Sequence, residues 1–269
     1  MATEIDGIKV HVRSWNDAAS PTIVCLHGFT GSSNTWLQLA NNIAARVIAI
    51  DLIGHGKTSA PEDVGQYTMD AQVELLENLF EHLSLHSIIL LGYSLGGRVA
   101  LSYAVRYPNR IQQLILESAS PGLENVEDRL ARQEADNSLA TEIEQNGLIA
   151  FIDKWQDIPL FASQRQLPQE VQKAVREERL QQREIGLANS LRGMGTGVMP
   201  QLWDRLNELK MPVTLITGQL DTKFVAIAEQ MEKHITKVKH QTILGAGHAI
   251  HVENLVEFAT IVKETFQEI

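Results

Sequence analysis

Short apolar runs alternate with segments of helical periodicity along most of the chain, and this alternation restricts the fold more than any other feature. The runs are rich in Ile, Val and Leu, which is typical of strands that are buried on both faces. Strands that alternate with helices form a mostly parallel, doubly wound α/β sheet, whose ligand crevice lies beyond the carboxyl ends of the strands. The predicted strands cover residues 22–26, 46–50, 87–91, 112–116, 213–217 and 240–244, and the predicted helices cover residues 69–83, 95–107, 225–235 and 253–266.

Two segments depart from this alternation. Residues 5–12 alternate apolar and polar side chains around an Asp-Gly pair, which predicts a β-hairpin at an antiparallel edge of the sheet. Residues 121–200 show helical patterns without a convincing strand, and this predicts an inserted helical lid. The domain division is therefore a core of residues 1–120 and 201–269 with a lid of residues 121–200. The predicted lid helices cover residues 123–145, 147–155 and 168–182.

Composition narrows the choice of partners. The formal net charge of −10 opposes binding to nucleic acid and to anionic membrane surfaces, and no apolar run approaches the length of a membrane span. The start of the chain lacks a basic segment followed by an apolar run, so a cytoplasmic location is expected. The single cysteine, Cys25, lies in an apolar run and is expected to be inert packing. No metal-ligand spacing or nucleotide loop is found, so neither a metal nor a cofactor is predicted, and a monomer or small homo-oligomer is expected.

The most specific local signal is the string GYSLGG at residues 92–97, which lies directly between a predicted strand and a predicted helix. A G-x-S-x-G motif in this context is a nucleophile elbow, in which a sharp turn projects the serine hydroxyl into the crevice. The sequence therefore predicts that Ser94 is catalytic.

Two later strand ends supply partners for Ser94. The string GQLD ends at Asp221 and the string GAGH ends at His248, and the order serine, acid, histidine is the one found on this scaffold. Asp221 is expected to hold the tautomer of His248, which takes the proton from Ser94. Glu117, at another strand end, is the rival acid, and His251 is interpreted as a helix-start or surface residue.

The string HGF at residues 27–29 follows an earlier strand, where this architecture places an oxyanion loop. The backbone N–H groups of Phe29 and Leu95 are expected to converge on developing negative charge. His27 is expected to brace that loop, and His55 is expected to be tied to backbone groups in a structural turn.

At this point the chain resembles the α/β-hydrolase superfamily over its full length. The strings YSLGGR (93–98), ESASPGL (117–123), WQDIPLF (155–161) and GQLDTKF (218–224) also resemble the 2-succinyl-6-hydroxy-2,4-cyclohexadiene-1-carboxylate synthase family of menaquinone biosynthesis. The resemblance implies a lyase that eliminates pyruvate from 2-succinyl-5-enolpyruvyl-6-hydroxy-3-cyclohexene-1-carboxylate. One departure is Ile53, where relatives usually have proline.

A substrate with several carboxylates requires cations in the site. Arg98 lies one helical turn beyond Ser94 on the same predicted face, so its guanidinium can reach the same pocket. The resemblance adds Arg132 and Arg179 as substrate-binding residues, and Lys223 follows the acid loop. For these arginines the alternative is surface solvation, which is also expected for Arg129, Arg165, Arg176 and Arg183. Tyr93, Trp155 and Phe161 are predicted to form apolar walls, with core packing as the alternative.

The mechanistic hypothesis is that His248 and Asp221 activate Ser94 as the base that abstracts a carbon-bound proton, without an acyl-enzyme. The oxyanion loop then stabilises the enolate-like charge as pyruvate leaves. The alternative enzyme class is a serine esterase or carbon–carbon bond hydrolase with Ser94 as nucleophile. A ligand receptor on this scaffold is disfavoured, because all three triad residues are present.

Overall fold

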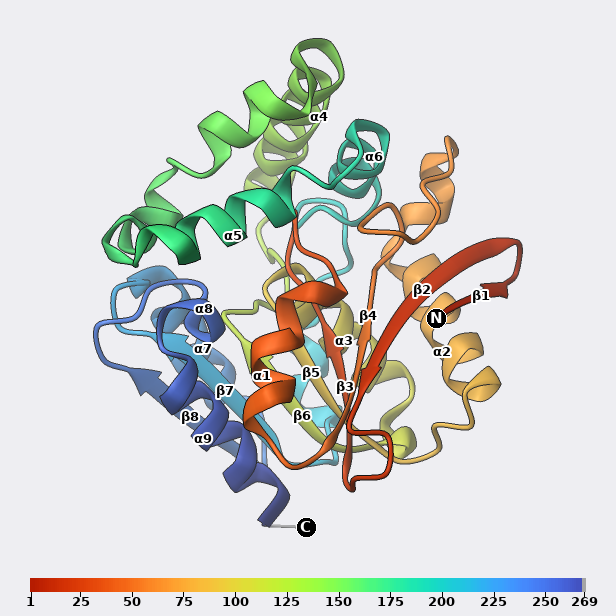
Figure 1. The fold of residues 1–269 in the computed structure, drawn as a ribbon, viewed down its shortest axis with the longest axis vertical. Coiled ribbons are helices and arrows are strands. Elements are labelled where there is room, and N and C mark those ends of the chain that lie inside the picture. Colours follow the sequence, from red (N-terminus) through yellow and green to blue (C-terminus); the bar gives the residue numbers. More distant parts are fainter. Residues whose placement is uncertain (268–269) are drawn as a thin grey trace.

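Eight strands form one sheet at the centre of the computed structural model, which describes residues 1–267 (Figure 1). Their order is β1-β2-β4-β3-β5-β6-β7-β8. The first two strands pair antiparallel and the other six are parallel, which confirms the predicted fold class. The strands are β1 (Ala2–Ile5), β2 (Ile8–Trp15), β3 (Thr22–Leu26), β4 (Arg46–Ile50), β5 (Ile88–Tyr93), β6 (Ile111–Glu117), β7 (Val213–Gly218) and β8 (Val238–Ile243).

Helices cover both faces of this sheet. On one face α2, α3 and α7 bury a large apolar cluster, and on the other face α1 and α9 bury a second cluster around Trp36 and Phe258. The helices are α1 (Leu37–Asn42), α2 (Met69–His82), α3 (Leu95–Arg106), α7 (Thr222–Glu232), α8 (Ile250–Glu253) and α9 (Leu255–Gln267). All four predicted core helices are present. The short α1 and α8 were not predicted, because four to six residues carry too little periodicity.

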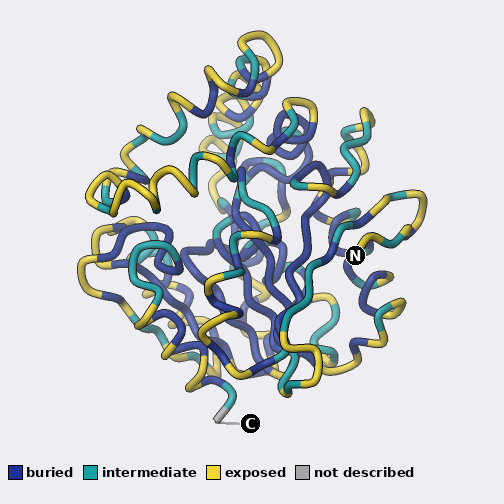
Figure 2. Tube along the Cα trace, viewed as in Figure 1, coloured by how far each residue is buried: buried dark blue, intermediate teal, exposed yellow. Residues whose placement is uncertain are grey.

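The helices α4 (Val126–Trp155), α5 (Gln169–Arg179) and α6 (Glu184–Met194) lie between β6 and β7 in the chain. We call them the lid helices, since they gather at one end of the sheet (Figure 1). Two of them, α4 and α6, enclose a small apolar cluster of their own, and the outer faces of the lid helices are exposed (Figure 2). The boundaries 121–200 of the lid stay a prediction, and residues 268–269 of the predicted core lie outside the described residues.

The two predicted helices 123–145 and 147–155 are joined as α4 across a sharp bend. Gly147 at the bend has φ +79° and ψ 166°, a conformation that is essentially restricted to glycine. Helix α6 was not predicted as a separate element. No helix within residues 1–267 is both long and apolar enough to cross a membrane.

Candidate active site

Ser94 lies in the turn between β5 and α3, with φ +50° and ψ −106°. This strained conformation is the one that a nucleophile elbow imposes on its serine. The turn is so tight that neither flanking glycine leaves room for a side chain. A Cβ atom on Gly92 would lie 2.3 Å from the carbonyl oxygen of Gly96, and one on Gly96 would lie 2.2 Å from that of Leu26.

The structure brings the predicted triad together. The Ser94 hydroxyl lies 3.0 Å from His248 Nε2, and His248 Nδ1 lies 2.6 Å from Asp221 Oδ2. His248 is 1% exposed and Asp221 is 8% exposed, so the imidazole is held away from bulk water. The three side chains follow β5, β7 and β8, whose carboxyl ends lie at the same edge of the sheet. This geometry suits transfer of a proton from the serine to the histidine.

The rival acid, Glu117, is paired with a different histidine. Its two carboxylate oxygens lie 2.8 and 2.9 Å from His251 Nδ1, and one of them also accepts the backbone N–H of His251 at 3.0 Å. His251 lies at the start of α8, which confirms the helix-start interpretation, and it is 6% exposed, so the surface interpretation is wrong. His251 can be buried because the Glu117 carboxylate, at the end of β6, forms hydrogen bonds with its ring and its backbone N–H.

The other two buried histidines hold backbone groups, as expected. His27 Nε2 accepts the N–H of Leu52 at 3.0 Å, and His27 Nδ1 lies 2.8 Å from the carbonyl oxygen of Gly28. His55 Nδ1 lies 2.9 Å from the carbonyl oxygen of Ile53. Burial lowers the pKa of His27 and lowers that of His55 to about 3. Both rings are therefore neutral braces at physiological pH.

Phe29 and Leu95 both line the cavity at Ser94. Leu95 is the first residue of α3, so its N–H is one of the helix amides without an intrahelical partner. Neither of these two backbone N–H groups donates a hydrogen bond to another group among residues 1–267. Both donors are therefore available to an oxyanion.

The cavity at the triad, which we call the triad cavity, has a volume of about 310 Å³ and is lined by three cations, Arg98, Arg132 and Lys223. Arg98 donates to the carbonyl oxygen of Met194 at 2.6 Å and has no carboxylate partner among the described residues. Burial, followed by the positive charge of Arg132, lowers the pKa of Arg98 to about 10. Two guanidinium groups that repel each other across one cavity form a binding site for anions.

One acidic group, Asp136, lies beside these arginines. Arg132 Nε donates to Asp136 Oδ1 at 2.8 Å, whereas the buried Oδ2 atom of Asp136 has no hydrogen-bond partner among the described residues. Burial raises the pKa of Asp136. Arg98 is only partly exposed and Arg132 pairs with Asp136, so neither guanidinium is simply a solvated surface group, although the Arg132 side chain is 41% exposed.

The predicted aromatic residues Tyr93, Trp155 and Phe161 also line the triad cavity. Trp155 packs edge-on against Phe29 and Phe161, with ring centroids 5.4 and 5.8 Å apart. Its indole N–H is buried without a hydrogen-bond partner among residues 1–267. A buried donor without a partner costs about 1–3 kcal/mol, so an acceptor on a ligand would stabilise it.

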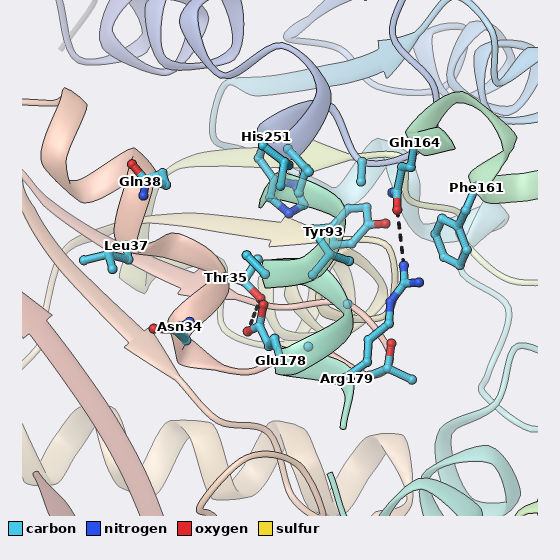
Figure 3. A pocket seen from close by; sticks show the side chains of 18 of the residues that line it. Asn34, Thr35, Leu37, Gln38, Tyr93, Phe161, Gln164, Glu178, Arg179 and His251 are labelled. Atoms are coloured by element: carbon cyan, nitrogen blue, oxygen red, sulfur yellow. Dashed lines mark hydrogen bonds between the residues drawn. The ribbon is translucent and has the colours of Figure 1, made fainter. Parts of the chain in front are cut away.

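Arg179 lies apart from the other predicted cations. It is 7% exposed and its guanidinium lies 4.5 Å from the centroid of the Phe161 ring, with one long hydrogen bond of 3.4 Å to Gln164 Oε1. It lines a second, larger cavity of about 570 Å³, which shares Phe29, Tyr93 and Phe161 with the triad cavity (Figure 3). The surface interpretation of Arg179 is therefore wrong, and its role in substrate binding stays a prediction.

Sequence reasoning missed several residues of the site. Phe224 packs against the imidazole of His248 with ring centroids 4.6 Å apart, and Glu253 accepts the backbone N–H groups of Gly247 and Ala249 at 2.6 and 3.3 Å. Arg183, predicted to be surface solvation, instead donates to the carbonyl oxygen of Thr58. No periodicity marks these residues, because each acts through a specific contact to a loop rather than through a regular helix or strand face.

Comparisons with known proteins identify the family of the chain. The profile of the alpha/beta hydrolase fold family matches residues 21–255. A protein of Bacillus subtilis (strain 168) that is provisionally named 2-succinyl-6-hydroxy-2,4-cyclohexadiene-1-carboxylate synthase is 43% identical over 263 residues, which are 97% of this chain and 96% of that protein. The synthase of that name from Klebsiella pneumoniae is 30% identical, covering 87% of this chain and 89% of that protein. The solved structure of MenH from S. aureus has a TM-score of 0.91 and 38% identity, covering 96% of this chain and 98% of that one.

Proposed function

This chain belongs to the α/β-hydrolase fold family and, within it, to the 2-succinyl-6-hydroxy-2,4-cyclohexadiene-1-carboxylate synthases, and from that premise we propose how its site performs the lyase reaction. The substrate is 2-succinyl-5-enolpyruvyl-6-hydroxy-3-cyclohexene-1-carboxylate. Loss of a carbon-bound proton and of pyruvate from this molecule gives the conjugated cyclohexadiene product. No water is added, so the reaction is an elimination rather than a hydrolysis.

The observation that carries this proposal is the placement of Arg98 and Arg132 on the triad cavity. A neutral ester does not require two guanidinium groups beside the serine, whereas a substrate with several carboxylates does. Bidentate contact between arginine and carboxylate fixes both position and orientation. Lys223 adds a third cation at the same cavity, and the unpartnered indole N–H of Trp155 offers a donor to a substrate oxygen.

The triad acts as the base in this mechanism. Asp221 holds the N–H of His248 Nδ1, so that Nε2 is free to take the hydroxyl proton of Ser94. The Ser94 oxygen then takes the proton from carbon, and His248 passes the hydroxyl proton that it holds to the departing enolpyruvate, which leaves as pyruvate. A positioned base of this kind contributes about 10²–10⁴-fold. The N–H groups of Phe29 and Leu95 stabilise the negative charge that develops as the C–O bond to pyruvate breaks.

Incubation of the protein with the enolpyruvyl adduct tests the proposal. We expect equal amounts of pyruvate and diene, measured by a coupled dehydrogenase assay and by diene absorbance, and we expect Ser94→Ala to abolish most of both. Folded wild-type protein that releases no pyruvate would remove the lyase assignment. A covalent Ser94 adduct, detected by mass spectrometry during turnover, would instead favour the nucleophilic mechanism of an esterase.

We also propose that the protein acts on this small anionic substrate in the cytoplasm, as a monomer or small homo-oligomer. The net charge of −10 supports the choice of a small anion as partner, because it opposes binding to nucleic acid and to anionic membranes and leaves the local arginines to select the ligand.

A further inference from the structure

Glu117 and His251 form a second buried acid–histidine pair beside the triad, and the mechanism above does not use it. Glu117 is 0% exposed and its carboxylate makes three hydrogen bonds to His251, through Nδ1 and the backbone N–H. His251 also borders the larger cavity, where Figure 3 shows it beside Tyr93. We infer that this pair positions the catalytic histidine against the catalytic serine.

The main chain of Glu117 holds the serine side of the site. Its carbonyl oxygen accepts the N–H of Ser94 at 2.9 Å. This bond directly follows the last pair of β5 and β6, in which Tyr93 lies opposite Glu117. Ser94 has a strained backbone, so it needs such a bond to stay in place.

The side chain of Glu117 holds the histidine side. His251 is three residues beyond His248, so the bonds to its ring and to its backbone fix the start of α8 and with it the end of the His248 loop. Glu253 fixes the same loop from the other side, through the N–H groups of Gly247 and Ala249. Glu117 is thus the one residue in this arrangement that bonds both to the serine turn and to the segment following the histidine.

The ring of His251 extends the contact to the wall of the triad cavity. It packs edge-on against Tyr93, with 4.7 Å between centroids, and lies tilted against Trp36, with 5.1 Å between centroids. Tyr93 in turn lies 5.4 Å from the ring of His248. Loss of the Glu117–His251 bonds therefore frees the histidine loop and the tyrosine together. Neither Glu117 nor His251 lines the triad cavity, so the pair acts through other residues.

The inference rests on the triad of the proposed function but not on the identity of its substrate, and two assays separate these claims. One is kcat and KM for pyruvate release. The other is the rate at which a small neutral fluorophosphonate modifies Ser94, which needs only the alignment of the serine with His248. In that reaction the Ser94 oxygen bonds to phosphorus, fluoride leaves and His248 takes the hydroxyl proton.

The variants are Glu117→Gln, His251→Phe and His251→Asn. Gln lacks the charge and Phe keeps the packing on Tyr93 without the donor, so we expect each to lower kcat and the modification rate by about 10–100-fold with KM little changed, as small misplacements in active sites do. His251→Asn restores an N–H near the position of Nδ1, and we expect it to recover much of the loss. Glu77→Gln is the matched control, since it weakens a carboxylate contact to Tyr103 and Arg110 away from the site.

Thermal unfolding of each variant separates loss of alignment from loss of fold. Unchanged kcat and modification rate in folded Glu117→Gln and His251→Phe would overturn the inference, as would a loss in His251→Asn equal to that in His251→Phe. Rapid modification of wild-type Ser94 without pyruvate release would overturn the lyase assignment alone.

Discussion

The sheet side and the lid side of the triad cavity are built in opposite ways. On the sheet side every triad group has a partner, and the strand ends and buried carboxylates hold each loop. On the lid side the cations are less completely paired. Arg98, which extends from α3 of the core to the lid, donates to the carbonyl oxygen of Met194 in α6, and Asp136, the ion-pair partner of Arg132, has a buried oxygen without a partner among the described residues. The base is therefore preorganised by the protein, whereas the charges of the lid side are to be completed by the substrate.

This division follows from what each side must do. A proton transfer needs donor and acceptor within hydrogen-bond reach before the substrate arrives. A site for a polycarboxylate needs cations that the protein has not fully neutralised, because a carboxylate partner such as Asp136 competes with the ligand. The two sides should therefore respond separately to substitution.

The largest effect is expected on the sheet side, from Asp221→Asn. The amide keeps the shape of the carboxylate but leaves the tautomer of His248 unspecified, so kcat should fall by about 10²–10⁴-fold. KM should change little, since Asp221 does not line the triad cavity. Steady-state pyruvate release measures both constants, with Asp204→Asn as an exposed control. A rise in KM as large as the fall in kcat would show that the two sides are not separable.

The next largest effect is expected from Arg98→Ala, since the guanidinium of this α3 residue lines the triad cavity and reaches the lid. Loss of a charged hydrogen bond of about 1.5–3 kcal/mol predicts a fall in kcat/KM of about 10–150-fold, carried mainly by KM. Modification of Ser94 by a neutral fluorophosphonate should be little changed. Arg192→Ala is the control, because that arginine lies on α6 and is paired with Glu144. Equal losses in both assays would mean that Arg98 supports the elbow rather than the substrate.

Burial of His55 on the sheet side should make the free energy of unfolding depend on pH. The unfolded imidazole of His55 has a pKa of 6.5 and the folded one has a pKa of about 3, so the unfolded state binds more protons between these values. The free energy of unfolding should therefore fall as pH falls from 6.5, by up to about 1.4 kcal/mol per pH unit from this residue. Urea unfolding at pH 4.5–7 should give a flatter slope in His55→Asn and an unchanged one in the exposed His86→Asn. Equal slopes in wild type and His55→Asn would show that His55 is not held neutral.

The two sides also differ in how far the sequence predicted them. Strand ends and motifs located the triad, since a parallel sheet brings the residues after β5, β7 and β8 to one edge whatever the details of packing. The pairing of Glu117 was not predictable in the same way. Two carboxylates and two histidines lie at that edge, and only the direction of each side chain decides which pairs form.

The sequence predicts the lid side less completely. The pattern of helices between β6 and β7 was visible, but α6 was missed and the bend at Gly147 joined two predicted helices into α4. Periodicity alone does not distinguish arginines that bind a ligand from arginines that donate to the backbone of a loop, because the residue type is the same in both. Arg183 shows this: it supports the carbonyl oxygen of Thr58, which lies 125 positions away in the chain.

The smallest effect is expected from Arg176→Ala, a change within the lid that leaves the triad cavity intact. Arg176 joins α5 to α4 through Asp153 at 2.6 Å and through Gln156 Oε1 at 3.0 Å, and both charged side chains are at least one-third exposed. An ion pair of this kind contributes about 0.2–1 kcal/mol, so unfolding in urea should shift slightly and the shift should shrink in 1 M salt. The KM for the adduct should stay at the wild-type value. If KM instead rose as much as in Arg98→Ala, the packing of the lid helices would control binding. The contrast between a preorganised base and an incompletely paired set of substrate cations would then no longer hold.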